Sequence, residues 1–246
     1  MVTRNSLPEL FGAALVINLA DRVDRRRAIE NEFRKVGWNS VLFFPAFKFD
    51  DAAGFPHVGW RGCFYSHLGC LQFAQQSGIE SILVFEDDVA LSSSIVRLTP
   101  LIEDALDNLR WDFLYFGHEK TGAIPRANNR TEHVDFECYK NELLTAHFYA
   151  VHKRIIPRLI AHFERNAGTV PHDGSYGPMP ADGAYNTFRV FNEDVVTYIA
   201  NPKLGWQRPS RSDLAPGRLD NLTMLRPLLG RVRQIKHFLN VKWNDY

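Results

Sequence analysis

Short apolar runs alternate with amphipathic stretches along most of the chain, and this alternation limits the folds that it can form. Apolar, β-branched and aromatic residues predict strands over 13–19, 40–47, 81–87, 111–117, 142–151 and 194–200. Apolar residues recurring at helical spacing predict helices over 21–37, 61–78, 99–109 and 153–168. Such alternation is typical of an α/β sandwich with a mostly parallel central sheet flanked by helices, and ligands bind beyond the carboxyl ends of its strands.

Helix ends are also readable. Gly37 and Gly78 follow two of the predicted helices and favour their termination there. Thr99 followed by Pro100 predicts an N-cap and a first helical position for the helix over 99–109.

Three adjacent acids, Glu86, Asp87 and Asp88, end the predicted strand in the segment LVFEDDVAL (83–91). Crowded carboxylates repel one another and are costly to bury unless a positive group lies among them. Because these acids lie where a strand ends, we expect a divalent cation, and Mg²⁺ and Mn²⁺ both prefer carboxylate oxygens. Side chains alternate along an extended chain, so Glu86 and Asp88 should share a face and Asp87 should point away. The alternative is a helix cap or a solvated turn.

A basic cluster, Arg22, Arg25 and Arg26, begins the helix after the first predicted strand. Basic side chains are unfavourable at a helix N-terminus unless an anion binds there. The alternative is an exposed basic face paired with Asp21, Asp24 and Glu30. Ser66 and His67 fall early in the helix over 61–78, and no G-x-S-x-G nucleophile elbow surrounds them.

Composition excludes some classes of function. The 246 residues carry 29 Lys+Arg and 28 Asp+Glu, and this balance gives no sign of nucleic-acid binding. The three cysteines have no pairing pattern, which fits a reducing compartment and predicts a cytoplasmic location. No apolar run reaches the roughly 18 residues of a membrane span. A metal-dependent phosphohydrolase or nuclease would want further acidic or histidine clusters at strand ends, and only Asp182 is a plausible partner.

Six short stretches occur in the order seen in glycosyltransferase family 25, which includes lipopolysaccharide-biosynthesis and collagen galactosyltransferases. They are INLADRVDRR (17–26), GCFYSH (62–67), LVFEDDV (83–89), TAHFYAV (145–151), PAD (180–182) and WQRPSRSDL (206–214). The chain resembles this family over residues 13–214. The resemblance implies a GT-A type nucleotide-binding sandwich, a divalent cation (Mn²⁺ or Mg²⁺), and transfer of a hexose, most often galactose, from a UDP-sugar with inversion.

The resemblance also implies roles for individual residues. Glu86 and Asp88 would form the metal-binding pair, and Asp182 would be the catalytic base, with a helix cap as its alternative and Asp173 as its rival. The residues expected at the nucleotide and donor are Asn18, Leu19, Arg22, Arg26, Ser66, His67, Glu86, Asp87, Gln207 and Ser212. The acceptor would be a glycan or glycolipid. A non-catalytic protein that retains the nucleotide-sugar cleft is the second reading.

Because the resemblance ends at residue 214, we predict two parts of the chain, a transferase domain over 1–214 and a basic tail over 215–246. Apolar residues recur at helical spacing from Pro227, flanked by Arg231, Arg233 and Lys236, and Trp243 follows. Such a helix over 227–243 either lies in an anionic membrane interface, placing the enzyme on the inner face of a membrane, or docks on its own core or on a twin subunit.

Overall fold

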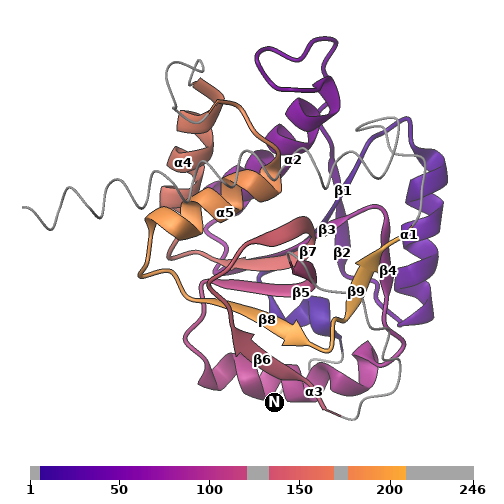
Figure 1. Ribbon diagram of the computed structural model, residues 1–246. Coiled ribbons are helices and arrows are strands. Elements are labelled where there is room, and N and C mark those ends of the chain that lie inside the picture. The colour runs from indigo at the N-terminus through magenta and orange to yellow at the C-terminus, as the bar shows by residue number, and fades with distance from the viewer. Residues whose placement is uncertain (1–5, 121–132, 169–176, 209–246) are drawn as a thin grey trace, which may run out of the picture.

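A seven-stranded sheet forms the centre of the computed structural model, which describes residues 6–120, 133–168 and 177–208 (Figure 1). The strand order is β2-β1-β3-β7-β5-β8-β6. Strands β2, β1, β3, β5 and β8 share one direction, and β7 and β6 run against them. The strands are β1 (Ala13–Asn18), β2 (Val41–Pro45), β3 (Ser81–Glu86), β5 (Phe113–Lys120), β6 (Asp135–Cys138), β7 (Leu143–His152) and β8 (Thr197–Asn201). The predicted mostly parallel sheet is therefore confirmed.

Helices cover both faces of this sheet (Figure 1). Helices α2 (Val58–Gln76), α4 (Ile156–Gly168) and α5 (Ala181–Phe191) pack on one face. Helices α1 (Val23–Lys35) and α3 (Ile95–Asn108) pack on the other, together with the short 3-10 helix η1 (Leu7–Leu10). Each face encloses its own apolar core, so the α/β sandwich is confirmed, and its layering agrees with the arrangement that the family resemblance implies.

The central strands are buried on both faces, which explains why they read as continuous apolar runs in the sequence. Five consecutive residues of β3, Ser81–Phe85, are buried, and only Glu86 is partly exposed. The predicted helix stops are also confirmed, because Gly37 and Gly78 have φ values of 72° and 63°, which favour glycine.

The prediction for α3 is wrong at its start. The helix begins at Ile95, one turn earlier than expected, and Thr99 lies inside it, where its hydroxyl donates to the carbonyl of Ile95 at 2.8 Å. Ile95 and Leu98 are buried in the core, and the free energy gained by burying them outweighs the preference of Pro100 for the first position of a helix. Because Pro100 has no N–H, the carbonyl of Val96 receives no helical hydrogen bond from it, and this costs little because Val96 is exposed.

Several short elements escaped prediction. Strands β4 (Val89–Leu91) and β9 (Gly205–Gln207) form a separate two-stranded sheet, and β9 follows the run at 194–200 that the sequence presents as the last strand. Strand β6 and helix α5 were likewise not predicted as elements. Strands of three or four residues are too short to show a period of two, which is why the sequence does not reveal them.

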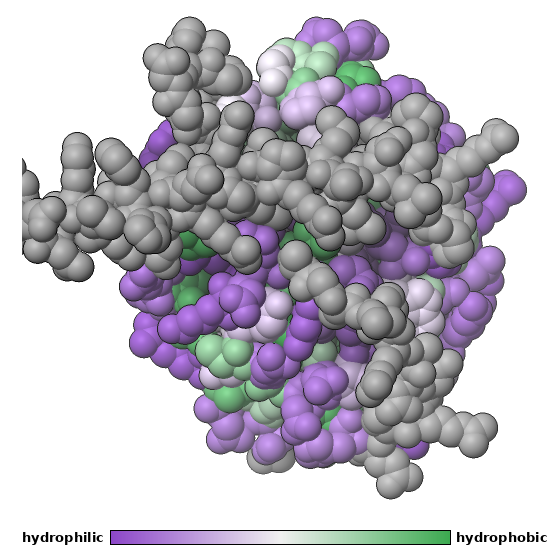
Figure 2. Space-filling model, in the orientation of Figure 1, coloured by the Kyte–Doolittle hydropathy of each residue, from purple (hydrophilic) through white to green (hydrophobic). Residues whose placement is uncertain are grey.

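The visible surface is mostly hydrophilic, with hydrophobic residues in separate patches (Figure 2). None of the described helices is long and apolar enough to cross a membrane. The boundary at 214, the helix over 227–243, Asp173 and Ser212 all lie outside the described residues.

Candidate functional site

The site lies where β1 and β3 end. These neighbouring strands are parallel, and their register pairs Ile17 with Glu86. Asn18, which follows Ile17, and Asp87, which follows Glu86, therefore lie side by side at the carboxyl ends of the two strands. The side-chain amide of Asn18 donates to Asp87 Oδ2 at 2.7 Å. The parallel arrangement thus brings two predicted site residues together from positions 69 apart in the sequence.

Asp87 connects this edge to helix α1. Arg25 Nη1 donates to Asp87 Oδ1 at 2.8 Å, and both side chains are largely buried. Burial raises the pKa of Asp87, although the Asn18 hydrogen bond and the Arg25 charge lower it. The sequence predicts that Asp87 points away from Glu86 and Asp88, and its partners indeed come from α1 and β1. With both oxygens paired, Asp87 holds α1 against the end of β3.

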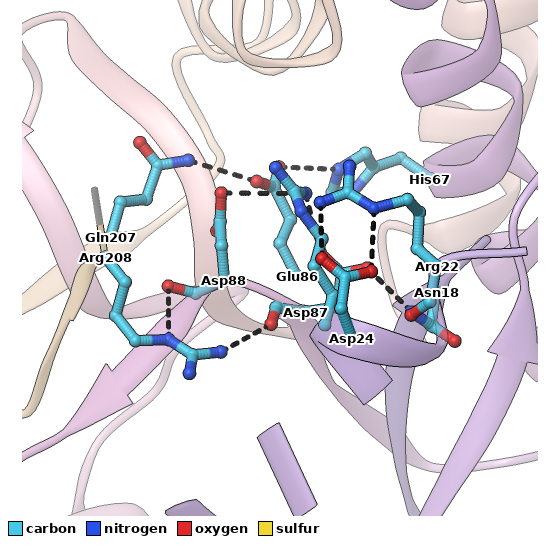
Figure 3. Close-up of polar contacts among 10 residues, drawn as sticks. Asn18, Arg22, Asp24, His67, Glu86, Asp87, Asp88, Gln207 and Arg208 are labelled. Carbon is cyan, nitrogen blue, oxygen red and sulfur yellow. Dashed lines mark hydrogen bonds and ion pairs between the residues drawn. The ribbon is translucent and has the colours of Figure 1, made fainter. Parts of the chain in front are cut away.

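Glu86 lies between a histidine and a glutamine (Figure 3). Its Oε1 is 3.3 Å from His67 Nε2, and its Oε2 accepts a hydrogen bond from Gln207 at 3.1 Å. Burial would raise the pKa of Glu86, but the hydrogen bond and charge of His67 outweigh it and leave that pKa below its usual value. Helix α2, strand β3 and strand β9 therefore meet at this one carboxylate.

Asp88 differs from its two neighbours because one of its oxygens has no partner. Oδ1 is buried and makes no hydrogen bond within the described part of the chain. Oδ2 is 3.9 Å from Arg25 Nη1. Burial, followed by the charge of Glu86, raises the pKa of Asp88 to about 7. A carboxylate left short of positive charge in this way is suited to a cation.

A pocket of about 250 Å³ opens at this edge, between α1, α2 and the segment 46–49. The predicted residues that line it are Leu19, Arg22, Ser66, His67, Glu86 and Asp87. Ser66 is fully buried, donates to the carbonyl of Gly62 and accepts from the amide of Phe47, so it also fixes the segment 46–49 to α2.

The basic cluster on α1 divides into three different environments. Arg22 lines the pocket and pairs with Asp24 at 2.9 Å (Figure 3). Arg25 lines the pocket and pairs with Asp87. Arg26 lies outside it, pairs with Glu30 at 3.1 Å and stacks over Phe43. The alternative of a paired basic face therefore describes Arg26 and, through Asp24, also Arg22. Arg25 belongs to the predicted cluster but was not named among the donor residues, and it lies in the pocket.

Asp182 lies in the first turn of α5 and is not among the residues that line the pocket. Its Oδ2 accepts from the amide of Thr145 at 3.1 Å, and its Oδ1 accepts from the amide of Gly183 at 2.9 Å. Burial raises the pKa of Asp182, and the charge of Glu86 raises it further. Thr145 has a φ of 70°, a strained value for a β-branched residue, and such strain is concentrated at functional sites.

Residues 58–170 match the family described as glycosyltransferase family 25 (LPS biosynthesis protein). A human protein named inactive glycosyltransferase 25 family member 3 is 33% identical over 132 residues, which cover 45% of this chain. Just under half of the chain is therefore similar to glycosyltransferase family 25. A mosquito family member, from Aedes aegypti, is 29% identical over 127 residues.

The sequence similarity covers a limited part of the length of these relatives. The match spans 22% of the human protein and 21% of the mosquito protein, so the chain spans about a fifth of the length of the curated relatives it matches. Among solved structures, a glycosyltransferase involved in glycosylation of the major capsid of PBCV-1 is 12% identical. That comparison covers 81% of this chain and 93% of the other, with a TM-score of 0.37, a value too low to establish a shared fold.

The predictions missed Cys63, Tyr149 and Arg208 at this site, and they named Arg25 only as a member of the basic cluster. Cys63 lines the pocket, and its spacing of four from His67 could have revealed it. Arg208 donates to the backbone carbonyls of Asp87 and Asp88, which closes the turn after β3 (Figure 3). Those contacts join residues about 120 positions apart, so no local sequence pattern could predict them.

Proposed function

We propose that this chain is an inverting, metal-dependent glycosyltransferase that moves a hexose, in the first instance galactose, from a UDP-sugar to a hydroxyl of a glycan or glycolipid, as in lipopolysaccharide synthesis. The observation that carries the proposal is the buried Oδ1 of Asp88, which has no hydrogen-bond partner among the described residues and lies beside Glu86. This arrangement is unfavourable in an isolated fold and becomes favourable when a cation binds. A nucleoside diphosphate leaving group needs the same cation.

The residues present fit Mn²⁺ or Mg²⁺. Asp88 offers an oxygen that no described group uses, and Glu86 would share an oxygen that now faces His67 or Gln207. Hard cations take such carboxylate oxygens and leave positions open for phosphate. When bound there, the cation would offset the negative charge that develops on the departing diphosphate.

The nucleotide would occupy the pocket between α1 and α2. Arg22 and Arg25 line it at the N-terminal end of α1, where helix N–H groups and guanidinium groups both favour phosphate. Leu19 and Phe47 supply apolar walls. Asn18 contributes by fixing Asp87, and through it Arg25, rather than by lining the pocket itself.

Asp182 is the proposed base. Inversion needs a carboxylate that takes the proton from the acceptor hydroxyl on the face opposite the leaving group. The raised pKa of Asp182 increases its proton affinity, and the amides of Thr145 and Gly183 hold the carboxylate in one orientation. Its first-turn position in α5 also matches the alternative role of a helix-end acid, and a single carboxylate can serve both.

A second candidate is a nucleotide-sugar-binding protein without turnover. The observation that favours it is the name of the human relative, which describes that protein as inactive. Both functions need the same pocket and cation, so they differ only in the chemical step.

Calorimetry of UDP with and without Mn²⁺, followed by assays of UDP release from a panel of UDP-sugars with glycan acceptors, separates the candidates. Transferase activity requires Mn²⁺-dependent UDP binding and transfer. Binding without any release supports the second candidate. Failure to bind UDP in the presence of either Mn²⁺ or Mg²⁺ contradicts both.

A further inference from the structure

A cysteine, a histidine and a glutamate meet on one wall of the pocket. Cys63 and His67 lie on α2, four residues apart and hence on the same side of the helix, and Glu86 ends the adjacent strand β3. One potential ligand atom from each residue lies within 4.8 Å of the other two. We propose that these three residues form a binding site for a thiophilic divalent cation of the Zn²⁺ class, separate in its ligand set from the hard-cation pair of Glu86 and Asp88.

The ligand types favour zinc over manganese or magnesium. Thiolate and imidazole are soft or borderline ligands, whereas the hard cations select carboxylates and water. A site with three protein ligands and one open position is the usual form of an accessible zinc site. Cys63, His67 and Glu86 all line the pocket, so the open position would face the space where a phosphate or water can enter.

The distances are compatible with a tetrahedral ion. Zinc bonds to nitrogen and oxygen are both about 2.0–2.1 Å, so the nitrogen–oxygen edge of a tetrahedron measures about 3.3–3.4 Å. His67 Nε2 and Glu86 Oε1 are already 3.3 Å apart. Small side-chain rotations would bring the Cys63 sulfur to a third corner of the tetrahedron, which leaves the fourth corner open.

The histidine is oriented from behind, as zinc ligands usually are. His67 Nδ1 lies 2.7 Å from the hydroxyl of Tyr149, which lies 2.6 Å from the hydroxyl of Tyr185. In the metal-bound form, Nδ1–H would donate to Tyr149 and Tyr149 to Tyr185, and the ion would replace the proton that Nε2 shares with Glu86. A hydrogen bond to the second ring nitrogen fixes the tautomer and orientation of a metal-binding histidine.

The other two cysteines do not share this environment. Cys70 is fully buried in the apolar core, and Cys138 is exposed on the edge strand β6. Binding at Cys63 would release one proton as the thiol becomes a thiolate bound to the ion. Because Glu86 belongs to both ligand sets, an ion held by Cys63 and His67 would compete with the hard cation.

Co²⁺ tests the site in the full chain without nucleotide, so the result does not depend on the proposed transferase activity. We expect one equivalent of Co²⁺ to give a thiolate-to-cobalt charge-transfer band, which Zn²⁺ displaces. Cys63→Ser should abolish the band, and the matched control Cys138→Ser should retain it. Tyr149→Phe, which removes the acceptor behind His67, should weaken Co²⁺ binding by about 10–100-fold.

A second measurement needs no variant. Zn²⁺ should slow alkylation of Cys63 by iodoacetamide, followed by mass spectrometry, while the rate at Cys138 stays unchanged. The proposal is wrong if folded wild-type protein gives no charge-transfer band, if the band survives in Cys63→Ser, or if Zn²⁺ leaves alkylation of Cys63 unaffected.

Discussion

Two buried aspartates at opposite edges of the sheet have opposite environments. Asp112 precedes β5 and is 3% exposed; its Oδ1 accepts from Arg154 at 3.2 Å and its Oδ2 accepts from the amide of Val196 at 2.9 Å. Asp88 follows β3 at the other edge, and its Oδ1 has no partner among the described residues. A buried polar atom without a partner is costly, and of these two aspartates only Asp88 has one among the described residues.

The difference indicates which edge of the sheet is available for a ligand. At the amino edge, Asp112 connects β5, β8 and the start of α4, and nothing more is needed. At the carboxyl edge, Glu86, Asp88 and Asp182 gather without enough positive charge, and each raises the pKa of a neighbouring group. Acids with perturbed pKa values beside a pocket are candidates for function, and Glu86 lines the pocket itself. The predictions below test this contrast.

The largest effect is expected at Asp182. Asp182→Asn keeps the shape of the side chain and removes the proton acceptor, so kcat should fall by about 10²–10⁴-fold. UDP affinity, measured by calorimetry with Mn²⁺, should change little because Asp182 does not line the proposed nucleotide pocket. Retention of kcat within a few-fold of wild type would transfer the role of base to another group, and Asp173 is then the next to be replaced.

Asp88 and Asp112 should respond in opposite ways to the same substitution. Asp88→Asn should lower Mn²⁺-dependent transfer by about 10²-fold or more, without loss of stability, because a cation ligand is lost and a repulsion is removed. Asp112→Asn should destabilise the fold by about 1–3 kcal/mol, because asparagine has a single acceptor oxygen and one of the two donors, Arg154 or the amide of Val196, loses its acceptor. UDP affinity should stay unchanged. Thermal unfolding and calorimetry on both variants check this. Equal loss of stability in the two variants would remove the contrast between the edges.

The same contrast predicts a dependence of stability on pH. The pKa of Asp88 is raised from 3.8 to about 7, so the folded state holds this proton more tightly than the unfolded state. The metal-free protein should therefore lose stability as pH rises from about 4 through 7, by up to a few kcal/mol, relative to Asp88→Asn. Chemical denaturation of both proteins across this range measures the difference. Parallel curves, or a wild type that gains stability with rising pH relative to the variant, would contradict the assignment.

The sequence predicts where in the sheet the site lies better than it predicts which side chains contact one another there. Glu86, Asp87 and Asp88 could be placed because a buried strand and its carboxyl end are local features. The choice between Arg25 and Arg26 could not, since both lie in the first turns of α1 and only the position of β3 decides which one meets Asp87. Short strands such as β9 leave no periodic signal, so Gln207 was expected from the family resemblance alone.

The smallest effect separates those two arginines. Arg25→Gln removes the ion pair with Asp87 and a guanidinium from the pocket wall, so UDP affinity should fall by about tenfold. Arg26→Gln removes an exposed pair with Glu30, which is worth about 0.3–0.5 kcal/mol at helical spacing, and the stacking of Arg26 over Phe43, both outside the pocket. It should leave UDP affinity unchanged, and calorimetry on the matched pair measures both outcomes. Loss of affinity in Arg26→Gln alone would restore the sequence-based choice of Arg26 and would remove Arg25 from the donor site.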